Sequence, residues 1–584
     1  MTRLDVAVLA AYLLGMLVLG VRYVGRNRGA RDMFAAGGRS PWWVSGLSGF
    51  MTLKSAGTFV VWGGLAYREG VVAIAINMCI GISGLLVGWV VAGRWRQLGV
   101  TTPAEFVQLR FGPNAVQLYT WAMMALRIVS TGVALYAVAV MLVALVPLAP
   151  GHPLRDEATG LLSLPFAILL FGAIVVVYTA VGGLWAVLMT DVMQFIVLQL
   201  SVLLLIPLLW LRLDTTAPLA VPAGFFSPFS AQYTPWFMIG WIAVHFFLVG
   251  AEWAFAQRYL CVPSPRDARK SAYLFGALYL VSPALWLTPP LLFRLLRPGV
   301  DSEQAYILAA QAVLPAGMLG MTMAAMFAAT ASSLSGQINV FAGVLTDQFY
   351  RRLYRPAATE HELVRAGRRF ALLIGAVVMI VAILIPRLGG AEKIVLTLTG
   401  MLFGPLLAPT IWGLLSGRIG TGAVFTCAFG SFAAGLWVRL GADPGGPFDG
   451  GWMAQWIQAN PRVTDILVGV VLPVLILSCA QLLGRGDRRQ WQAVRARMAT
   501  AKSEAQAERT DISGDHSPAR VVAISLATSG LLMLGLAAFN RQAWEMMVSF
   551  GIALLMLATV AGWGAAQALL AAWRHSRTTP SRRA

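Results

Sequence analysis

Long apolar segments, separated by short breaks that are rich in charge, proline or glycine, make up most of the chain. About fifteen of them are roughly 18 to 30 residues long, enough to cross the hydrocarbon core of a bilayer as an α-helix. The pattern therefore predicts an all-α polytopic membrane protein. The expected spans are 4–24, 42–66, 71–93, 115–147, 162–181, 184–211, 235–258, 272–295, 311–347, 369–388, 393–416, 421–440, 463–483, 519–539 and 546–573.

The segment from Trp42 to Gly70 is apolar enough to cross a membrane, yet it is crowded with small residues. Its centre reads SGFMTLKSAG, where glycines and hydroxyl residues weaken a regular helix and surround Lys54. Lys54 is about twelve residues from either end, or about 18 Å at helical rise, which is far for snorkelling. An interrupted helix with an ionisable residue at mid-membrane predicts a transport site. The alternative is a helix-packing face from which Lys54 snorkels outward.

Composition supports a membrane protein and excludes a nucleic-acid-binding one. The chain is 58% hydrophobic and 12% charged, with a mean hydropathy of +0.72. Its formal charge of +19 would suggest nucleic acid in a soluble protein, but the basic residues gather in short loops between apolar spans. Most of the 44 basic residues fall on one predicted side, which is then the cytoplasm. We expect a cytoplasmic-membrane protein with its N-terminus outside and its C-terminus inside.

The spans divide into six predicted regions. Two sets of five spans each begin with an interrupted helix and contain a long third helix, and the odd number inverts the second set relative to the first, as in inverted-repeat secondary transporters. The linker at 484–518 is expected to be a cytoplasmic helix. The four cysteines show neither disulfide nor zinc spacing. The regions are 1–41 (N-terminal helix and cytoplasmic loop), 42–211 (first repeat), 235–416 (second repeat), 421–483 (additional helices), 484–518 (linker) and 519–584 (helix pair and basic tail).

Six stretches, in order along the chain, resemble the sodium:solute symporter family, which includes bacterial proline, sugar, pantothenate and sialic acid carriers. The resemblance covers about residues 1–485. It implies the inverted-repeat fold, alternating access and an ion gradient as the energy source. The stretches read RDMFAAGGRSPWWVSGLS, SAGTFVVWGGLAYREG, TTPAEFVQLRFG, VYTAVGGLWAVLMTDVMQFIV, AQRYLCVPSPRDARKS and FAATASSLSGQINVFAGVLTDQFYR.

The resemblance implies a sodium site between the broken helix and the long helix of the second repeat. Ala329, Ser332 and Ser333 match its hydroxyl half, and hydroxyl and carbonyl oxygens suit a hard cation. Met51 and Lys54 fall at the two positions whose carbonyls face the ion. A Lys54 ammonium at this site would satisfy the serine hydroxyls and replace sodium, or carry a proton as access alternates. In the competing interpretation Lys54 points away, pairs with an acid and leaves sodium binding intact.

Glu252 and Arg127 are the charged candidates for solute binding or coupling. Glu252 lies six residues before Arg258, where the family has a solute-contacting polar residue. It is expected to form a salt bridge with Lys54 or Arg127, to bind the solute or to carry a proton. Arg127 is expected to have a structural role first and to bind a solute carboxylate second.

Four further residues complete the predicted site. Asp191 matches a family acid and is expected to act as a gate or ion-exit residue, with helix capping as the alternative. Thr58, Trp253 and His245 are expected to face the solute, together with residues of MLFGPLLAPTIWGLL. A satisfied core position remains the simpler interpretation for His245.

The sequence carries no HExxH, no Walker-type loop and no nucleophile elbow in a soluble context, so an enzyme is not expected. We therefore expect a secondary active transporter that imports a small polar organic solute, coupled to sodium or, through Lys54, to protons or to neither. Its partners are then the solute and the lipid bilayer, with no cofactor besides the coupling ion. The alternative is a solute-sensing receptor of the same fold that acts through a separate partner. Neither the solute nor an oligomeric state is indicated.

Overall fold

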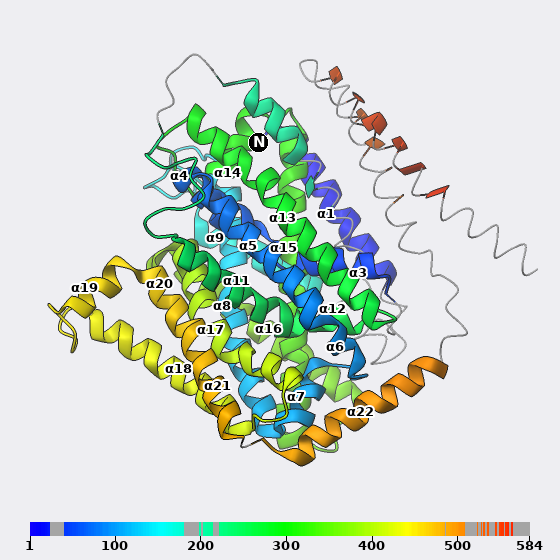
Figure 1. The fold of residues 1–584 in the computed structure, drawn as a ribbon. Helices are drawn as coiled ribbons and strands as arrows, with labels where there is room; N and C mark the ends of the chain where they lie inside the picture. Colours follow the sequence, from blue (N-terminus) through cyan, green and yellow to red (C-terminus); the bar gives the residue numbers. More distant parts are fainter. Residues whose placement is uncertain are drawn as a thin grey trace, which may run out of the picture.

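The computed structural model describes residues 1–23, 40–179, 202–213, 221–484 and 486–507, with isolated positions between 195 and 199 and between 523 and 563. Within these residues the protein is almost wholly α-helical, and the only β-bridges are isolated ones in the loop that follows α8 (Figure 1). Eight of the described helices are long and apolar enough to span a membrane, or nine if one bent pair is a single span. The count of about fifteen spans stays a prediction.

The described helices follow the expected spans closely. In chain order they are α1 (Arg3–Tyr23), α3 (Trp42–Thr52), the π-helix η3 (Thr58–Trp62), α4 (Gly63–Glu69), α5 (Val72–Val90), α6 (Ala92–Gln97), α7 (Pro103–Phe111), α8 (Pro113–Leu145), α9 (Leu164–Thr179), α11 (Pro235–Ala251), α12 (Trp253–Leu260), α13 (Pro265–Leu296), α14 (Ala305–Val313), α15 (Met318–Val344), η4 (Leu345–Tyr354), α16 (Glu360–Leu384), η5 (Ile385–Leu388), α17 (Gly390–Leu415), α18 (Thr421–Ala442), α19 (Trp452–Ala459), α20 (Pro461–Ile466), η6 (Leu467–Val471), α21 (Leu472–Leu483) and α22 (Arg488–Ala507).

Both helices that the sequence predicts to be interrupted are broken. The first ends at Thr52 and resumes as a π-helix at Thr58, and it stops at Gly70, whose φ of 74° suits glycine. The second bends by 54° between α11 and α12. Its break falls at Glu252, which has an extended backbone and accepts a hydrogen bond from the amide of Ala254. At each break polar side chains replace some of the hydrogen bonds that the helix loses there, from Ser55 and Thr58 at the first and from Glu252 at the second.

One span that is predicted to be continuous is divided by a break. The sequence predicts a continuous helix over 311–347, but α14 ends at Val313 and α15 begins at Met318. Pro315 lacks a backbone N–H, and Gly317 takes a left-handed conformation with φ of 88°. Hydropathy does not register this break because the intervening residues are apolar. Within the predicted linker, α22 is helical, and the cytoplasmic location of the linker stays a prediction.

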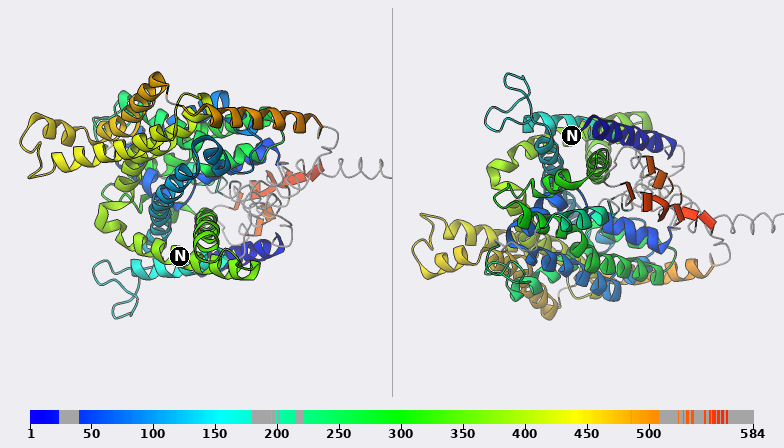
Figure 2. Two further views of the ribbon diagram at one scale, coloured as in Figure 1. Left: turned by 90° about the horizontal axis from the view of Figure 1, so that it is seen from below. Right: turned by 90° about the horizontal axis from the view of Figure 1, so that it is seen from above.

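The helices pack in two main groups. One consists of α3, α4, α5, α11, α12 and α13, and its most extensive contact is between α5 and α13. The other consists of α8, α9, α15 and α16. The helix α17 packs on both α11 and α8. Viewed along the helices, α18 and α19, in yellow, project from one side of the molecule (Figure 2).

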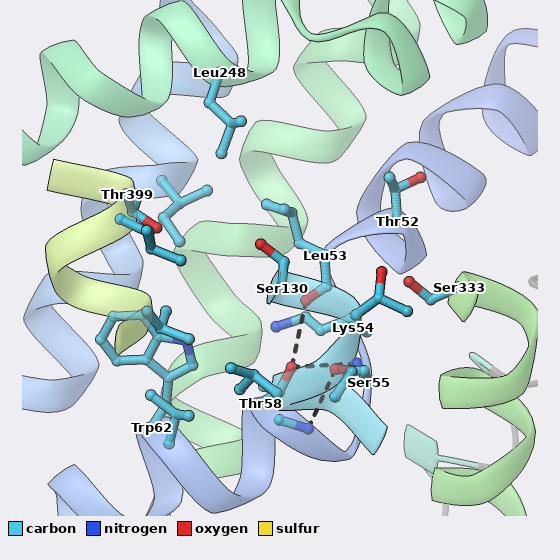
Figure 3. Close-up of a pocket in the computed structure, with 18 of the residues that line it drawn as sticks. Thr52, Leu53, Lys54, Ser55, Thr58, Trp62, Ser130, Leu248, Ser333 and Thr399 are labelled. Carbon is cyan, nitrogen blue, oxygen red and sulfur yellow. Dashed lines mark hydrogen bonds between the residues drawn. The ribbon is translucent and has the colours of Figure 1, made fainter. Parts of the chain in front are cut away.

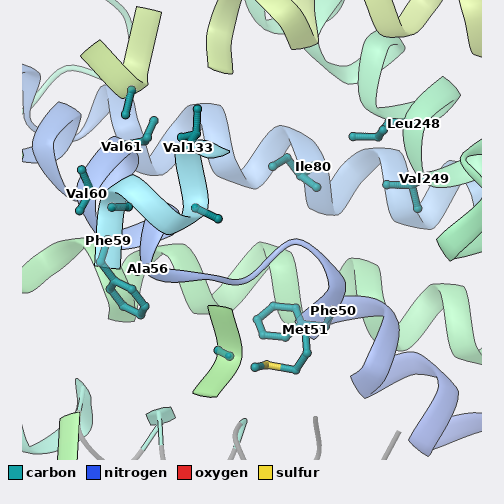
Figure 4. Packing of buried hydrophobic residues seen from close by; sticks show 14 of the residues in the cluster. Phe50, Met51, Ala56, Phe59, Val60, Val61, Ile80, Val133, Leu248 and Val249 are labelled. Atoms are coloured by element: carbon teal, nitrogen blue, oxygen red, sulfur yellow. The ribbon is translucent and has the colours of Figure 1, made fainter. Parts of the chain in front are cut away.

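The broken first helix is fixed by burial on both sides of its break. Phe50 and Met51, before the break, and Ala56 and Phe59, after it, are almost fully buried in one hydrophobic cluster (Figure 4). Ring contacts extend this cluster to α13, because Phe59 stacks on Trp286 at 5.5 Å. The unwound residues between them are therefore held by packing as well as by hydrogen bonds.

The N-terminal helix α1 caps α15. The α15 helix has no side-chain cap of its own, and the Oδ1 atom of buried Asp5 accepts hydrogen bonds from the amides of Gly317 (2.7 Å) and Gly320 (3.1 Å). A carboxylate at a helix N-terminus satisfies orphan amides and complements the helix dipole.

We expect Asp5→Ala to destabilise the protein by about 2 kcal/mol, because it removes the cap and leaves two buried amides unpaired. Thermal unfolding of the purified protein in detergent should show a lower midpoint than the wild type. Asp443→Ala is the control, because Asp443 is exposed. An equal effect of the two changes would contradict the capping role.

Candidate functional site

A cavity of about 160 Å³ lies between the two helix groups, beside the unwound residues of the first broken helix (Figure 3). Its wall combines the segment Thr52–Thr58 with α5, α11 and α13 from one group, α8 and α15 from the other, and α17. The polar residues that line it are Thr52, Lys54, Ser55, Thr58, Asn77, Arg127, Ser130, Thr131, His245, Tyr279, Ser333, Gln337 and Thr399.

The unwound segment is tied to both sides of its own break and to α15. Thr58 Oγ1 donates to the carbonyl of Leu53 at 3.4 Å, and the Ser55 hydroxyl accepts from the amide of Gly57 at 3.2 Å (Figure 3). The amide of Ala56 donates to Thr330 Oγ1 at 2.8 Å. The segment Leu53–Gly57 thus joins the two helix groups at the edge of the cavity.

Lys54 is buried, with 3% of its surface exposed, and its ammonium lies among aromatic rings. The Nζ atom is 4.2 Å from the ring centre of Trp286, 4.3 Å from that of Tyr279 and 5.0 Å from that of Phe50. Within the described residues it forms neither an ion pair nor a hydrogen bond, whether to Glu252 or to Ser333. The faces of the rings carry partial negative charge and can stabilise an ammonium at this position.

Arg127 and Glu252 form a buried ion pair across the two helix groups. Arg127 Nη2 lies 2.8 Å from Glu252 Oε1, and the side chains are 12% and 4% exposed. Glu252 also caps α12, whose Ala254 amide donates to Oε2 at 3.1 Å. The sequence leaves open whether Glu252 pairs with Lys54 or with Arg127, and in the structure it pairs with Arg127. Arg127 lines the cavity, and its buried Nε has no hydrogen-bond partner among the described residues.

The residues predicted for the ion site are only partly brought together. Ser333 lines the cavity, and Ala329 is buried in α15 one turn away. The carbonyl of Met51 accepts the amide of Lys54 at 2.9 Å, so it is engaged in the turn that ends α3. Ser332 lies on α15 between Ala329 and Ser333, but its side chain is outside the described part of the structure.

The predicted solute-facing residues divide between the cavity and its surroundings. Thr58 and His245 line the cavity. His245 Nδ1 donates a hydrogen bond to the carbonyl of Trp241 at 3.0 Å, so Nε2 is the ring nitrogen that can bind another partner. Trp253 is half-buried against the core and is not among the lining residues. From the stretch MLFGPLLAPTIWGLL on α17, Phe403 lines the cavity. Asp191 lies outside the described residues.

Several lining residues were not predicted from the sequence. Asn77 is the one amide in the apolar run VAIAINMCIG of α5, which is a usable signal for a polar site inside a membrane helix. Gln337 lies about one turn after the matched serines on α15, in a stretch that the family resemblance already covers. Tyr279 gave no signal, because an aromatic residue in so apolar a helix is ordinarily a core or lipid-facing one.

A second charged cluster joins the end of α4 to α17. Arg68 forms an ion pair with Glu392 and donates to Ser302 Oγ at 2.9 Å. Next to it, Tyr136 donates to Glu303 at 2.5 Å, and Glu303 accepts the amide of Ala391 at 3.1 Å. The cluster lies at the end of α4 away from the break, so it closes that end of the broken helix against its neighbours.

Comparison with known families decides the class of the protein. The sequence profile of the sodium:solute symporter family matches residues 33–212 and 297–430, more than half of the chain. The chain belongs to the sodium:solute symporter family. This symporter is therefore a secondary active transporter of a multi-pass membrane type, and the comparisons give the receptor alternative no support.

Two curated relatives and one solved structure illustrate the similarity. The symporter is 24% identical over 462 residues to a sodium/sialic acid symporter of Aliivibrio fischeri, covering 75% of this chain and 88% of that protein. It is 29% identical over 445 residues to the human sodium/iodide cotransporter, covering 72% of this chain and 66% of the cotransporter. A solved Na⁺-coupled sialic acid symporter in a substrate-bound outward-open state has the same fold, with a TM-score of 0.61 at 20% identity over 81% of this chain and 98% of that one.

Proposed function

We propose that this symporter imports a small polar organic solute that carries a carboxylate, that it does so by alternating access, and that sodium is the coupling ion. The cavity beside the first broken helix is the solute site. The observation that carries this proposal is that Arg127 lines the cavity while its buried Nε donor has no hydrogen-bond partner in the described structure.

The charges at the cavity favour an acid. Arg127 is paired with Glu252, and Lys54 adds a further positive charge for which the described residues provide no counter-ion. Buried charges are costly unless paired, so a solute carboxylate complements this wall better than a second cation does. Thr58, Asn77 and Gln337 provide donors and acceptors for the hydroxyl or amide groups of the rest of the solute.

Sodium is the favoured coupling ion for two reasons. The relatives named above are sodium-coupled, and the Lys54 ammonium lies against α13 rather than at the α15 hydroxyls. We propose that Ala329 contributes its carbonyl, that Ser332 and Ser333 contribute their hydroxyls, and that main-chain carbonyls of Met51 and Lys54 complete the site when the turn opens. Asp191 remains a proposed exit residue. A proton on Lys54 or Glu252 is the competing mode of coupling.

The ion pairs suggest how access alternates. Arg127 and Glu252 connect the two helix groups beside the solute, so relative motion of the groups must change this contact. Arg68 and Glu392 hold α4 against α17 at the end that the charge pattern of the loops places outside the cell. We propose that release of this pair opens the cavity to the outside in a cytoplasmic membrane, with the N-terminus outside.

The proposal is tested by ligand-induced thermal stabilisation of the purified symporter with matched solute pairs: sialic acid and its methyl ester, pantothenate and panthenol, and gluconate and glucose. We expect an acid to raise the midpoint of thermal unfolding where its uncharged counterpart does not. This stabilisation should occur in sodium buffer and not in potassium buffer, because potassium is too large for the same oxygen ligands. Stabilisation by the uncharged member alone would contradict the solute class. Binding that ignores sodium but changes with pH would contradict sodium coupling and support the proton mode.

A further inference from the structure

The aromatic rings around Lys54 form a compartment of their own at the edge of the cavity. Phe50 and Tyr279 are 4.9 Å apart, and Phe50 and Trp286 are 5.6 Å apart, measured between ring centres. All three side chains are nearly fully buried. Lys54 and Tyr279 also line the solute cavity, so the compartment opens toward it.

The rings are held in place independently of Lys54. Trp286 stacks on Phe59 and donates its indole N–H to Gln199, and Tyr279 contacts Phe275 at 5.0 Å. Rings on α3 and on α13 contribute to the compartment, and these two helices belong to the same helix group. The compartment is therefore preorganised, and all three of its rings belong to the helix group that contains the first broken helix.

This geometry is that of a receptor for an organic ammonium group. Three ring faces lie within about 5 Å of one nitrogen, and such cages bind alkylammonium ions because the rings attract a desolvated cation. Here the cation is covalently attached to the chain. A tethered ligand does not dissociate, so it excludes any free competitor of the same kind.

We infer that Lys54 is a built-in occupant of an organic-cation site formed by Phe50, Tyr279 and Trp286, and that it bars ammonium-bearing solutes from the cavity. This restricts the class of solute. Amines, quaternary ammonium compounds and amino acids are excluded because Lys54 occupies the aromatic site that would bind their ammonium group, whereas acids without an ammonium group can still bind. The restriction on the solute rests on the proposed function. The cation site itself does not, because it can be measured without any transported solute.

The test is chemical rescue. Lys54→Ala removes Cγ, Cδ, Cε and Nζ, which together correspond to n-propylammonium, and thermal unfolding in detergent reports its binding. We expect n-propylammonium to raise the midpoint of Lys54→Ala in a saturable way, with half-saturation at a concentration about tenfold lower than for any effect on the wild type. Lys54→Ser carries the same prediction should the alanine variant not be recovered.

Three controls separate charge from filled space. Lys54→Met fills the compartment with an apolar chain and should not respond to n-propylammonium. The uncharged 1-propanol should not rescue Lys54→Ala, and Trp286→Leu in the Lys54→Ala background should abolish the rescue. Equal stabilisation by 1-propanol, an equal response of the wild type or rescue that survives Trp286→Leu would each overturn the inference. Acid binding by the wild type tests the proposed function separately, so the two failures are distinguishable.

Discussion

Replacement of Arg127 by methionine is expected to weaken binding of the acidic solute by about 100-fold or more. A charge-assisted hydrogen bond is worth about 1.5 to 3 kcal/mol, and loss of the cation also removes the attraction for the carboxylate. Arg127→Lys should recover only part of the affinity, because an ammonium cannot serve Glu252 and the solute with the planar, forked geometry of a guanidinium. The measurement is the solute concentration that half-stabilises each purified variant.

Loss of affinity must be separated from loss of structure, because Arg127→Met leaves Glu252 buried without its partner. The double variant Arg127→Met with Glu252→Gln removes both charges, so it should recover thermal stability without recovering affinity. Arg439→Met is the matched control. Arg439 forms a 2.6 Å ion pair with buried Asp465, and it is not among the residues that line the cavity. That change should lower stability and leave solute affinity nearly unchanged. Normal affinity in Arg127→Met would contradict the proposed solute site.

The architecture was readable from the sequence because each relevant signal is local. A glycine and hydroxyl cluster around Lys54 predicts the first break. The span over 235–258 is predicted to be interrupted by polar residues, and the structure places that break at Glu252. The start of α15 was placed wrongly because hydropathy alone does not weigh Pro315 and Gly317. The inverted repeat and the full number of spans remain predictions.

The site was less predictable, because it depends on which side chains face one another. Burial of Lys54 followed from its position, but the direction of its side chain did not, since the rings that surround it come partly from α13, more than 200 residues away. The choice between Lys54 and Arg127 as the partner of Glu252 also required the position of Arg127, on α8, relative to the break at Glu252. Periodicity reports which residues are apolar, and it does not report which elements meet.

The second large effect is expected from Gly404→Ala, which should prevent α17 from packing and greatly reduce the yield of folded protein. Gly404 is buried in α17, and a Cβ atom there would overlap the backbone carbonyl of Gly469 in η6. Gly469 in turn faces the carbonyl of Gly400 in the same close way. Backbone at this distance cannot yield as a flexible side chain does, so we expect a loss of about 3 kcal/mol or more.

Gly422→Ala is the matched control, because Gly422 lies in the membrane helix α18 and a Cβ atom there would meet nothing within 4 Å. Its thermal midpoint should be unchanged or raised, since alanine favours a helix by up to about 1 kcal/mol over glycine. Thr399 and Phe403 line the cavity from α17 and lie within five residues of Gly404, so any Gly404→Ala protein that is recovered should also bind the acid less tightly. A monodisperse Gly404→Ala protein with the wild-type midpoint would show that α17 and η6 do not make this backbone contact.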